Sequence, residues 1–464
     1  MSADRLTVLQ VSPADIGGGA EKVAFDLHRQ YVERGMDSWL AVGRKLSADE
    51  QVLEIPDDPN PSRWKSGLLG LAQSSPSEGT LSGSRWAIDR ALRTAADPAH
   101  MVRIQRGLEN FDFPGTALLP TLPPTRPSVL HLHNLHGEYF DIRALPPLTE
   151  QQPTILTMHD VWPLTGHCAY PLTCERWRVG CGDCPDLALP IPIRRDASEE
   201  NCRIKRDALS AGGRLRVATP SRWLMRLVEE SGLADSLAET RVIPNGVDTD
   251  VFRPGNRAEA RDRLGLPQDA TIVLFSARSA KSSPFKGFET LEAALPLIEH
   301  ASSASPNLLL LALGEESPDI DAGGVPISFR PFAEDARTVA LYNQAADLYI
   351  HPARAESFGL SVAEAMACGI PVVASGVGGI PEVVLHRETG LIFSDGDVVQ
   401  LAQSVKALLG DARMRGRMGE AGRSRVGSQF TLDRQVETYY AWYRHLAEPS
   451  RGDQPTRRTP LSAT

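Results

Sequence analysis

Residues 356–382 read ESFGLSVAEAMACGIPVVASGVGGIPE, and this stretch combines the local signals of one α/β unit. Gly359 precedes a run of good helix formers, residues 371–375 have the composition of a buried strand, and a glycine-rich loop follows. Glu356 and Glu364 stand eight positions apart across the expected helix start. Eight helical steps of about 1.5 Å would separate them by roughly 12 Å, which is about the span of a diphosphate with a sugar at one end and a ribose at the other.

The backbone between these two glutamates is suited to an anion. Ser357, Phe358, Gly359 and Leu360 open the expected helix, where unpaired N–H groups and the helix dipole favour negative charge. Gly359 also lets the backbone approach a ligand closely. A helix start with acidic residues that favour the dipole needs no ligand, however, so the pair alone leaves both interpretations open.

Length and composition restrict the class of protein. A chain of 464 residues with 42% hydrophobic residues is long enough for two domains with ordinary cores. The net charge of -9 argues against a nucleic-acid partner held by a general electrostatic field. No run of eighteen apolar residues occurs, and the start MSADRLTVLQVSP lacks the pattern of a secretory signal, so we expect a cytoplasmic protein.

Short apolar segments with the character of buried strands recur along the chain, each followed by polar, helical or glycine-rich residues. They are LTVLQV (6–11), SVLHLHN (128–134), TILTMHD (154–160), RVAT (216–219), TIVLFSA (271–277), NLLLLALG (307–314), DLYIHP (347–352) and PVVAS (371–375). This alternation predicts an α/β protein with two tandem Rossmann-like domains that face an interdomain cleft, and chemistry at the carboxyl ends of the strands.

The expected domain limits follow from where this alternation of strands and helices is interrupted and where it resumes. We expect a first domain over 1–240, with insertions at about 56–127 and 162–200, and a second domain over 241–430. An aromatic helix over 431–446 and a disordered tail over 447–464 complete the chain.

The opening stretch resembles the donor-site segment of the retaining glycosyltransferases of family 4, whose fold is GT-B. The resemblance extends over nearly the whole chain, because IGGGAEKVAFDLHRQYVERG, LTMHD, TPSRW, IPNGVD, FKGFETLEAAL and TGLIF occur in the order of that family. It implies transfer of a sugar from a UDP- or GDP-sugar to an acceptor hydroxyl with retention, in surface polysaccharide or glycoconjugate biosynthesis. The leaving phosphate would help to deprotonate the acceptor, and catalysis would require no metal.

The resemblance also assigns roles to individual residues. Glu356 would face the transferred sugar, Glu364 would hold the ribose hydroxyls, and His159 would contact the sugar near the reacting centre. Arg278 and Lys286 would hold the diphosphate, although the inserted residues AKSSPF leave Lys281 as a competitor of Arg278. The glycine loop with Gly18 and Gly19 would approach the diphosphate from the first domain. For His131, His133 and His136, a buried or capping role is the more common outcome.

Four cysteines cluster directly after His159. Cys168, Cys174, Cys181 and Cys184 lie within seventeen residues and end in a Cys-x-x-Cys pair, and thiolates in such a group suit zinc. The spacing departs from that of paired zinc knuckles, so free thiols, or disulfides formed after lysis, remain alternatives. Similar cysteine-containing insertions occur in polysaccharide-assembly members of the family that the chain resembles.

Two other functions compete with glycosyl transfer. A nucleotide-sugar epimerase shares the two-domain fold but lacks the PNGVD crossover, and a catalytically inactive relative would only bind a partner. A lipid-linked acceptor would bring the first domain to the inner face of the membrane. Five basic residues are candidates for that face, with an exposed charged helix as the alternative: Arg194, Arg195, Arg203, Lys205 and Arg206.

Overall fold

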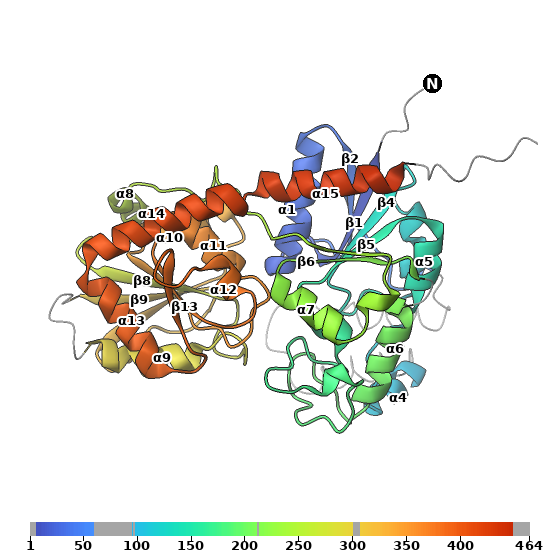
Figure 1. Ribbon diagram of the computed structural model, residues 1–464, viewed down its shortest axis with the longest axis horizontal. Helices are drawn as coiled ribbons and strands as arrows, with labels where there is room; N and C mark the ends of the chain where they lie inside the picture. The colour runs from blue at the N-terminus through green and yellow to red at the C-terminus, as the bar shows by residue number, and fades with distance from the viewer. Residues whose placement is uncertain (1–5, 60–94, 96–97, 211–212, 300–306, 449–464) are drawn as a thin grey trace, which may run out of the picture.

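The computed structural model describes residues 6–59, 95, 98–210, 213–299 and 307–448. Within them the chain forms two α/β units that lie side by side (Figure 1). Each unit is built on a seven-stranded sheet. The fold class expected from the alternating strands and helices is confirmed.

The first sheet has the strand order β3-β2-β1-β4-β5-β6-β7, and every pairing in it is parallel. Its central strands are buried along their length, as expected when helices cover both faces of a parallel sheet. The strands are β1 (Thr7–Ala14), β2 (Asp37–Arg44), β3 (Val52–Glu54), β4 (Val129–His133), β5 (Thr154–Thr157), β6 (Arg216–Thr219) and β7 (Glu239–Val242). The helices are α1 (Gly19–Glu33), α4 (Pro98–Gln105), α5 (Leu145–Gln151), α6 (Ser198–Ser210) and α7 (Arg222–Glu230).

The second sheet has the strand order β10-β11-β9-β8-β12-β13-β14, with only the edge strand β10 antiparallel. The strands are β8 (Thr271–Ser276), β9 (Leu308–Leu313), β10 (Ile320–Ala322), β11 (Val325–Arg330), β12 (Leu348–His351), β13 (Val372–Ser375) and β14 (Gly390–Phe393). The helices are α8 (Arg257–Leu264), α9 (Phe288–Glu299), α10 (Ala336–Ala345), α11 (Leu360–Ala367), α12 (Ile380–Val383), α13 (Val398–Gly410) and α14 (Ala412–Gln429).

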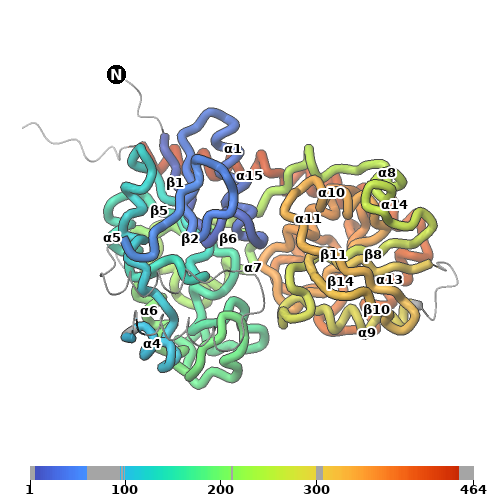
Figure 2. Tube along the Cα trace, turned by 180° about the vertical axis from the view of Figure 1, so that it is seen from behind, coloured from blue at the N-terminus to red at the C-terminus, as the bar shows by residue number. Residues whose placement is uncertain are grey.

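The last described helix, α15 (Leu432–Ala447), returns to the first unit and lies beside α1 in both views (Figures 1 and 2). Its aromatic face carries Tyr439, Trp442 and Tyr443, which are fully buried against apolar residues of β1 and α1. The aromatic helix expected over 431–446 is therefore part of the core of the first unit.

The chain crosses between the units twice, and the two crossing segments pair with each other. Val247 N donates to Phe430 O at 2.8 Å, and Leu432 N donates to Val247 O at 2.9 Å. A Cβ added to Gly246 would stand 2.5 Å from Leu432 Cα, so only glycine fits this close approach.

A second contact joins the units through α12 and α7. The side-chain oxygens of Glu382 accept hydrogen bonds from Arg222 N at 2.9 Å and Trp223 N at 2.7 Å. Ser221 Oγ accepts from Leu224 N at the same helix start. A carboxylate at a helix N-terminus is favoured by the unpaired N–H groups there, so this contact is a polar clasp between the two units.

Some expectations fall outside the described residues. Residues 60–94 and 96–97 of the expected insertion and the expected tail from 449 onward lie outside the described residues. Within the insertion near 56–127, the described part contains α4 and a 3-10 segment over Pro114–Thr121. None of the described helices is both long enough and apolar enough to cross a membrane.

Candidate functional site

The opening glutamate pair lies where β12 leads into α11. Glu356 is in the connecting loop, and α11 begins only at Leu360, with Gly359 as its N-cap at φ +91°. The estimate of 12 Å treated all eight steps as helical, whereas only the four from Leu360 to Glu364 are, and these four contribute about 6 Å along the axis. A Cβ on Gly359 would meet Ile380 Cδ1 at 2.5 Å, so the sharp turn requires glycine.

The glycine loop after β13 supports this turn. A Cβ on Gly378 would stand 1.8 Å from Glu356 O, and one on Gly379 would stand 2.1 Å from Ser357 O. Gly379 N also donates to Glu356 O at 3.0 Å. The loop therefore fixes the backbone of the two residues that precede the helix.

Glu356 lies against two basic side chains. Its Oε2 is 3.5 Å from Lys286 Nζ and 3.5 Å from His351 Nε2. Burial alone would raise the pKa of Glu356, but the charge of Lys286 and the contact with His351 outweigh it and lower the pKa to about 2. The His351 side chain is 3% exposed, and neither ring nitrogen has a hydrogen-bond partner of good geometry among the described residues.

Glu364 faces the first unit. Glu364 is 6% exposed as a residue, and burial raises its pKa to about 7 although the Lys22 ammonium lowers it. Lys22 belongs to α1, and its Nζ is 2.5 Å from Asp26 Oδ2. Lys22 was not predicted from the sequence, because only the folded chain brings α1 to α11.

The first glycine loop lies at the start of the same α1 helix. Gly18 is the N-cap and Gly19 the first helical residue, and both are exposed. A Cβ on Gly17 would stand 3.0 Å from Glu21 Cγ, so the loop passes closely beside that side chain. The N–H groups at the N-terminus of α1 favour an anion, although the first turn also carries the acidic Glu21.

The cations expected at the diphosphate separate into two groups. Lys286 contacts Glu356, as described above. Arg278 is exposed, with its guanidinium 5.1 Å from the Phe332 ring centre, and Lys281 Nζ is 4.1 Å from the Phe329 ring centre. The structure therefore brings Lys286 to the glutamate and directs Lys281 onto an aromatic ring.

His159 lies beyond the end of β5 and is 8% exposed. Burial lowers its pKa to about 4, so the ring is neutral near pH 7. Its Nε2 is 3.0 Å from His133 Nδ1. His131 and His133 are fully buried and hydrogen-bonded, and His136 pairs with Asp160 at 2.7 Å.

Tyr170 joins His159 to the second unit, and sequence reasoning missed this role. Its hydroxyl donates to His159 O at 3.4 Å and lies near Ser357. Its ring meets Phe285 edge-on at 5.2 Å. The remaining residues of the expected anion site, Phe358 and Leu360, are buried and partly buried.

The four clustered cysteines border one small cavity together with His167. His167 Nε2 is 3.3 Å from Cys184 Sγ, and Cys181 Sγ accepts a hydrogen bond from Gly166 N at 3.1 Å. The ligand types fit zinc. In the parts of the chain that the structure describes, however, no three histidine, cysteine or carboxylate side chains are grouped closely enough to hold an ion. A zinc site stays a prediction.

Not all of the basic residues proposed for a membrane-facing surface are exposed. Lys205 is fully buried, with its Nζ 2.6 Å from Glu109 Oε1 and 4.1 Å from the Trp162 ring centre. Its inclusion in the exposed set was wrong, because Glu109 pairs with it from 96 positions away. Arg194, Arg195 and Arg203 are exposed.

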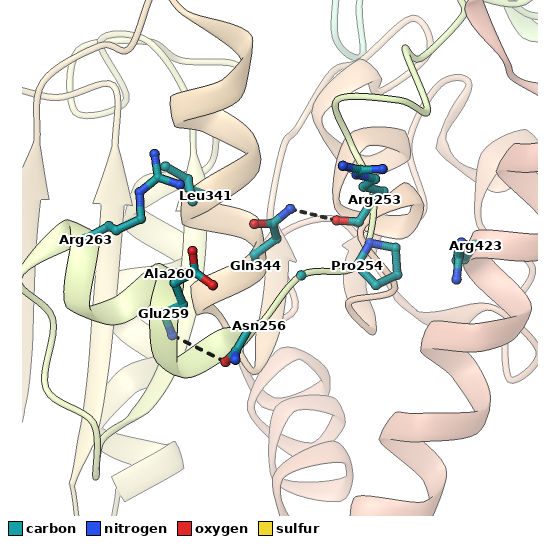
Figure 3. Close-up of a pocket in the computed structure, with 10 residues that line it drawn as sticks. Arg253, Pro254, Asn256, Glu259, Ala260, Arg263, Leu341, Gln344 and Arg423 are labelled. Atoms are coloured by element: carbon teal, nitrogen blue, oxygen red, sulfur yellow. Dashed lines mark hydrogen bonds between the residues drawn. The ribbon is translucent and has the colours of Figure 1, made fainter.

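A cavity of about 490 Å³ lies elsewhere on the second unit, where Arg253, Arg263 and Arg423 surround Glu259 and Asn256 (Figure 3). It contains none of the residues expected at the site. A smaller cavity of about 160 Å³ lies in the first unit beside His136 and Trp162.

Sequence comparison finds the family model described as glycosyl transferases group 1 over residues 256–425. D-inositol 3-phosphate glycosyltransferase 1 from Catenulispora acidiphila is 33% identical over 258 residues, covering 53% of this chain and 60% of that protein. The D-inositol 3-phosphate glycosyltransferase of Mycobacterium bovis is 36% identical over 218 residues, covering 45% and 44%. The chain thus spans about half the length of these relatives.

Solved structures resemble the whole chain. Sucrose-phosphate synthase from Thermosynechococcus elongatus has a TM-score of 0.63 at 21% identity and covers 95% of this chain and 99% of its own. Anabaena Alr3699/HepE, solved in complex with UDP-glucose, has a TM-score of 0.60 at 17% identity and covers 95% and 100%. At such identities the likeness shows the fold. The model of glycosyl transferases group 1 thus matches residues 256–425, and the fold of the whole chain is GT-B.

Proposed function

We propose that this protein is a retaining glycosyltransferase that moves a hexosyl group from a UDP- or GDP-sugar to an acceptor hydroxyl. The observation that carries the proposal is the cluster of Lys286, His351 and Glu356 at the start of α11. A cation beside a half-buried carboxylate at the carboxyl end of a parallel sheet suits a leaving diphosphate next to a sugar. The UDP-glucose bound by the Anabaena neighbour supports a nucleotide-sugar donor.

Each side chain has a defined task in this proposal. Lys286, with Arg278, would neutralise charge on the departing diphosphate, and Glu364 would accept hydrogen bonds from the ribose hydroxyls. The low pKa of Glu356 keeps it ionised, so it can stabilise positive charge that develops on the sugar ring. Neutral His159 would accept a hydrogen bond near the reacting centre. The leaving phosphate oxygen would take the proton of the acceptor hydroxyl on the same face, which retains the configuration.

The acceptor is proposed to occupy the cavity of about 160 Å³ in the first unit. His136 and Trp162 line it, and His136 is paired with Asp160, the neighbour of His159 in the chain. An aromatic wall beside polar groups suits a sugar. We further propose that the acceptor is a sugar or a lipid-linked sugar in surface polysaccharide or glycoconjugate assembly, in the cytoplasm at the inner face of the membrane.

The test begins with thermal denaturation of the pure protein against UDP- and GDP-sugars. A ligand at a hundred times its dissociation constant adds about 2.7 kcal/mol to the free energy of unfolding, which gives a readable shift. Lys286→Ala should weaken binding of the effective donor about tenfold or more, because a charged hydrogen bond is lost. Lys281→Ala is the matched control and should bind normally, since Lys281 stacks on Phe329.

Product analysis then separates the competing functions. Transfer of the sugar to an acceptor glycan, with the anomeric configuration kept, supports the proposal. Isomerisation of the donor without an acceptor would establish an epimerase instead. If no nucleotide sugar shifts the melting temperature, the inactive partner-binding alternative replaces the proposal.

A further inference from the structure

A line of buried polar side chains runs from the core of the first unit to His159. Gln10 of β1, His133 of β4 and Tyr443 of α15 are each fully buried. The roles proposed above leave these three without a task. Buried polar groups are costly unless they are paired, so their pairing pattern is informative.

Each step of this line is a hydrogen bond. Gln10 Nε2 donates to the Tyr443 hydroxyl at 3.2 Å, and Gln10 Oε1 is 2.9 Å from His133 Nε2. His133 Nδ1 is 3.0 Å from His159 Nε2. The Tyr443 hydroxyl is in turn 2.5 Å from His131 Nδ1.

In the orientation that the Gln10 amide has in this structure, the hydrogen bonds determine where the protons lie. The Gln10 carbonyl oxygen only accepts, so the proton of His133 must be on Nε2. Burial lowers the pKa of His133 well below its usual value, which keeps the ring neutral and leaves Nδ1 as an acceptor. His159 must then donate from Nε2. Because His159 is neutral as well, its Nδ1 carries the lone pair.

We propose that Gln10, held by Tyr443 and acting through His133, sets the tautomer of His159 with the proton on Nε2 and the lone pair on Nδ1. Among the described residues, no hydrogen-bond partner is found for His159 Nδ1, so that lone pair is available to a substrate hydroxyl. Gln10, His133 and Tyr443 are therefore positioning residues. Their effect on turnover rests on the proposed function, whereas the tautomer itself does not.

Tyr443 connects this line of hydrogen bonds to the last helix of the chain. Tyr443 belongs to α15, which follows the second unit in the chain and packs on the first. Gln10 and Tyr443 are 433 positions apart. The final helix thus reaches the histidine of the first unit through two side chains.

A Gln10 amide rotated by 180° would reverse the direction of the hydrogen bonds along this line. The amide nitrogen would then donate to His133 Nε2, the proton of His133 would move to Nδ1, and His159 would carry its proton on Nδ1. Oxygen and nitrogen of an amide differ only through such networks, so the tautomer must be measured directly.

The experiment is nitrogen NMR of histidine-labelled full-length protein, with the His159 signals assigned by their loss in His159→Asn. We expect wild-type His159 to be protonated on Nε2. Tyr443→Phe should give a mixture of tautomers at His159, because the hydroxyl that orients Gln10 is lost. Tyr439→Phe is the matched control. Tyr439 is an equally buried tyrosine of α15 whose hydroxyl contacts Thr157 at 2.7 Å. Its hydroxyl reaches Tyr443 only through Thr157 and His131, and its loss leaves the hydrogen bond between Tyr443 and Gln10 in place, so the tautomer should not change.

Kinetics supply the second readout. His133→Phe should lower kcat about tenfold or more while the donor KM stays nearly unchanged, since general acid–base contributions are of the order of 100-fold or larger. His133→Asn offers an acceptor oxygen near the position of Nδ1 and should restore part of the rate. Thermal denaturation must show that the variants are folded.

The two proposals fail in different ways. Wild-type His159 protonated on Nδ1, or the same tautomer in Tyr443→Phe as in wild type, would overturn the positioning role whatever the activity. The expected tautomer in a protein that transfers no sugar would overturn only the proposed function.

Discussion

The two glutamates that flank the start of α11 differ in their electrostatic environment. Both are largely withdrawn from solvent, yet the pKa of Glu356 is lowered to about 2 and that of Glu364 is raised to about 7. Lys286 and His351 lie against the first. The second has Lys22 in its surroundings, but Lys22 is itself paired with Asp26. One carboxyl is thus held ionised, and the other titrates near neutral pH.

This difference predicts a pH-dependent donor affinity. A ribose hydroxyl donates to the Glu364 carboxylate, and below a pKa of about 7 the carboxyl is increasingly protonated. UDP-glucose, which keeps both phosphate charges in this range, should therefore bind about tenfold more weakly near pH 6 than near pH 8. Calorimetric titration with UDP-glucose at the two pH values measures this difference in affinity.

Glu364→Gln is the control for this effect. An amide does not titrate, so the variant should bind weakly at both pH values with little difference between them. A wild-type affinity that is flat with pH would contradict the role of Glu364 in ribose binding, as would an equal pH dependence in the variant.

Part of this residue-scale arrangement could be predicted from the sequence. The helix start, the glycine turn and the cation before α9 are local patterns, and the structure brings Lys286 and Glu356 together. Lys22 could not be predicted, because its proximity to Glu364 depends on how α1 packs against α11. Lys205 was misplaced for the same reason, since its partner Glu109 lies in a segment without regular periodicity.

At the scale of elements, the loop between β5 and α6 carries both the cysteines and the tyrosine that touches the second unit. Tyr170 lies between Cys168 and Cys174 in the chain and contacts Ser357 and Phe285. Among its described residues this loop has only short 3-10 turns, at Trp162–Leu164 and Arg176–Arg178. A zinc ion bound by the cysteines would therefore restrict the motion of the loop and stabilise its contact with the second unit.

The zinc prediction is tested on this loop. We expect about one zinc ion per chain in protein purified without chelator, because four thiols and His167 border one cavity that a modest closure would convert into a tetrahedral site. Removal of the ion should lower the melting temperature. Elemental analysis by mass spectrometry gives the stoichiometry.

Two cysteine variants make this test specific. Cys184→Ser should lose the ion, whereas Cys368→Ser, which changes a buried thiol of the second unit, should retain it. Wild-type protein without zinc and with all six thiols reactive after unfolding would show that the cysteines are free.

At the scale of the whole molecule, two further kinds of contact hold the units together besides that of Tyr170. The paired crossings at Val247 and Leu432 use backbone hydrogen bonds, and α15 adds a buried aromatic face. The clasp of Glu382 on the N-terminus of α7 is a different kind of contact, because a single side chain makes it. It joins helix α12 of the second unit to helix α7 of the first, away from the crossings. The alternation of strands predicted both sheets, but it carried no information on which surfaces would meet.

The clasp leads to a prediction about domain motion. Removing the Glu382 carboxylate leaves two N–H groups of α7 without their acceptor, a loss of roughly 1–2 kcal/mol at a helix N-terminus. The crossings and α15 are untouched, so Glu382→Ala should stay folded. Its radius of gyration in small-angle X-ray scattering should increase, because the units can separate on the α12 side.

The kinetic consequence of this separation follows from where the site residues lie. Lys286, Glu356 and Glu364 all belong to the second unit, so donor binding by Glu382→Ala should stay within about threefold of wild type, as expected where no direct contact is lost. Transfer also requires His159 of the first unit, and kcat should fall about tenfold, the equivalent of about 1.4 kcal/mol.

Glu388→Ala, which changes an exposed glutamate six positions further on, is the matched control and should leave donor binding and kcat unchanged. An unchanged kcat in Glu382→Ala would mean that the crossings and α15 suffice to keep His159 beside the donor.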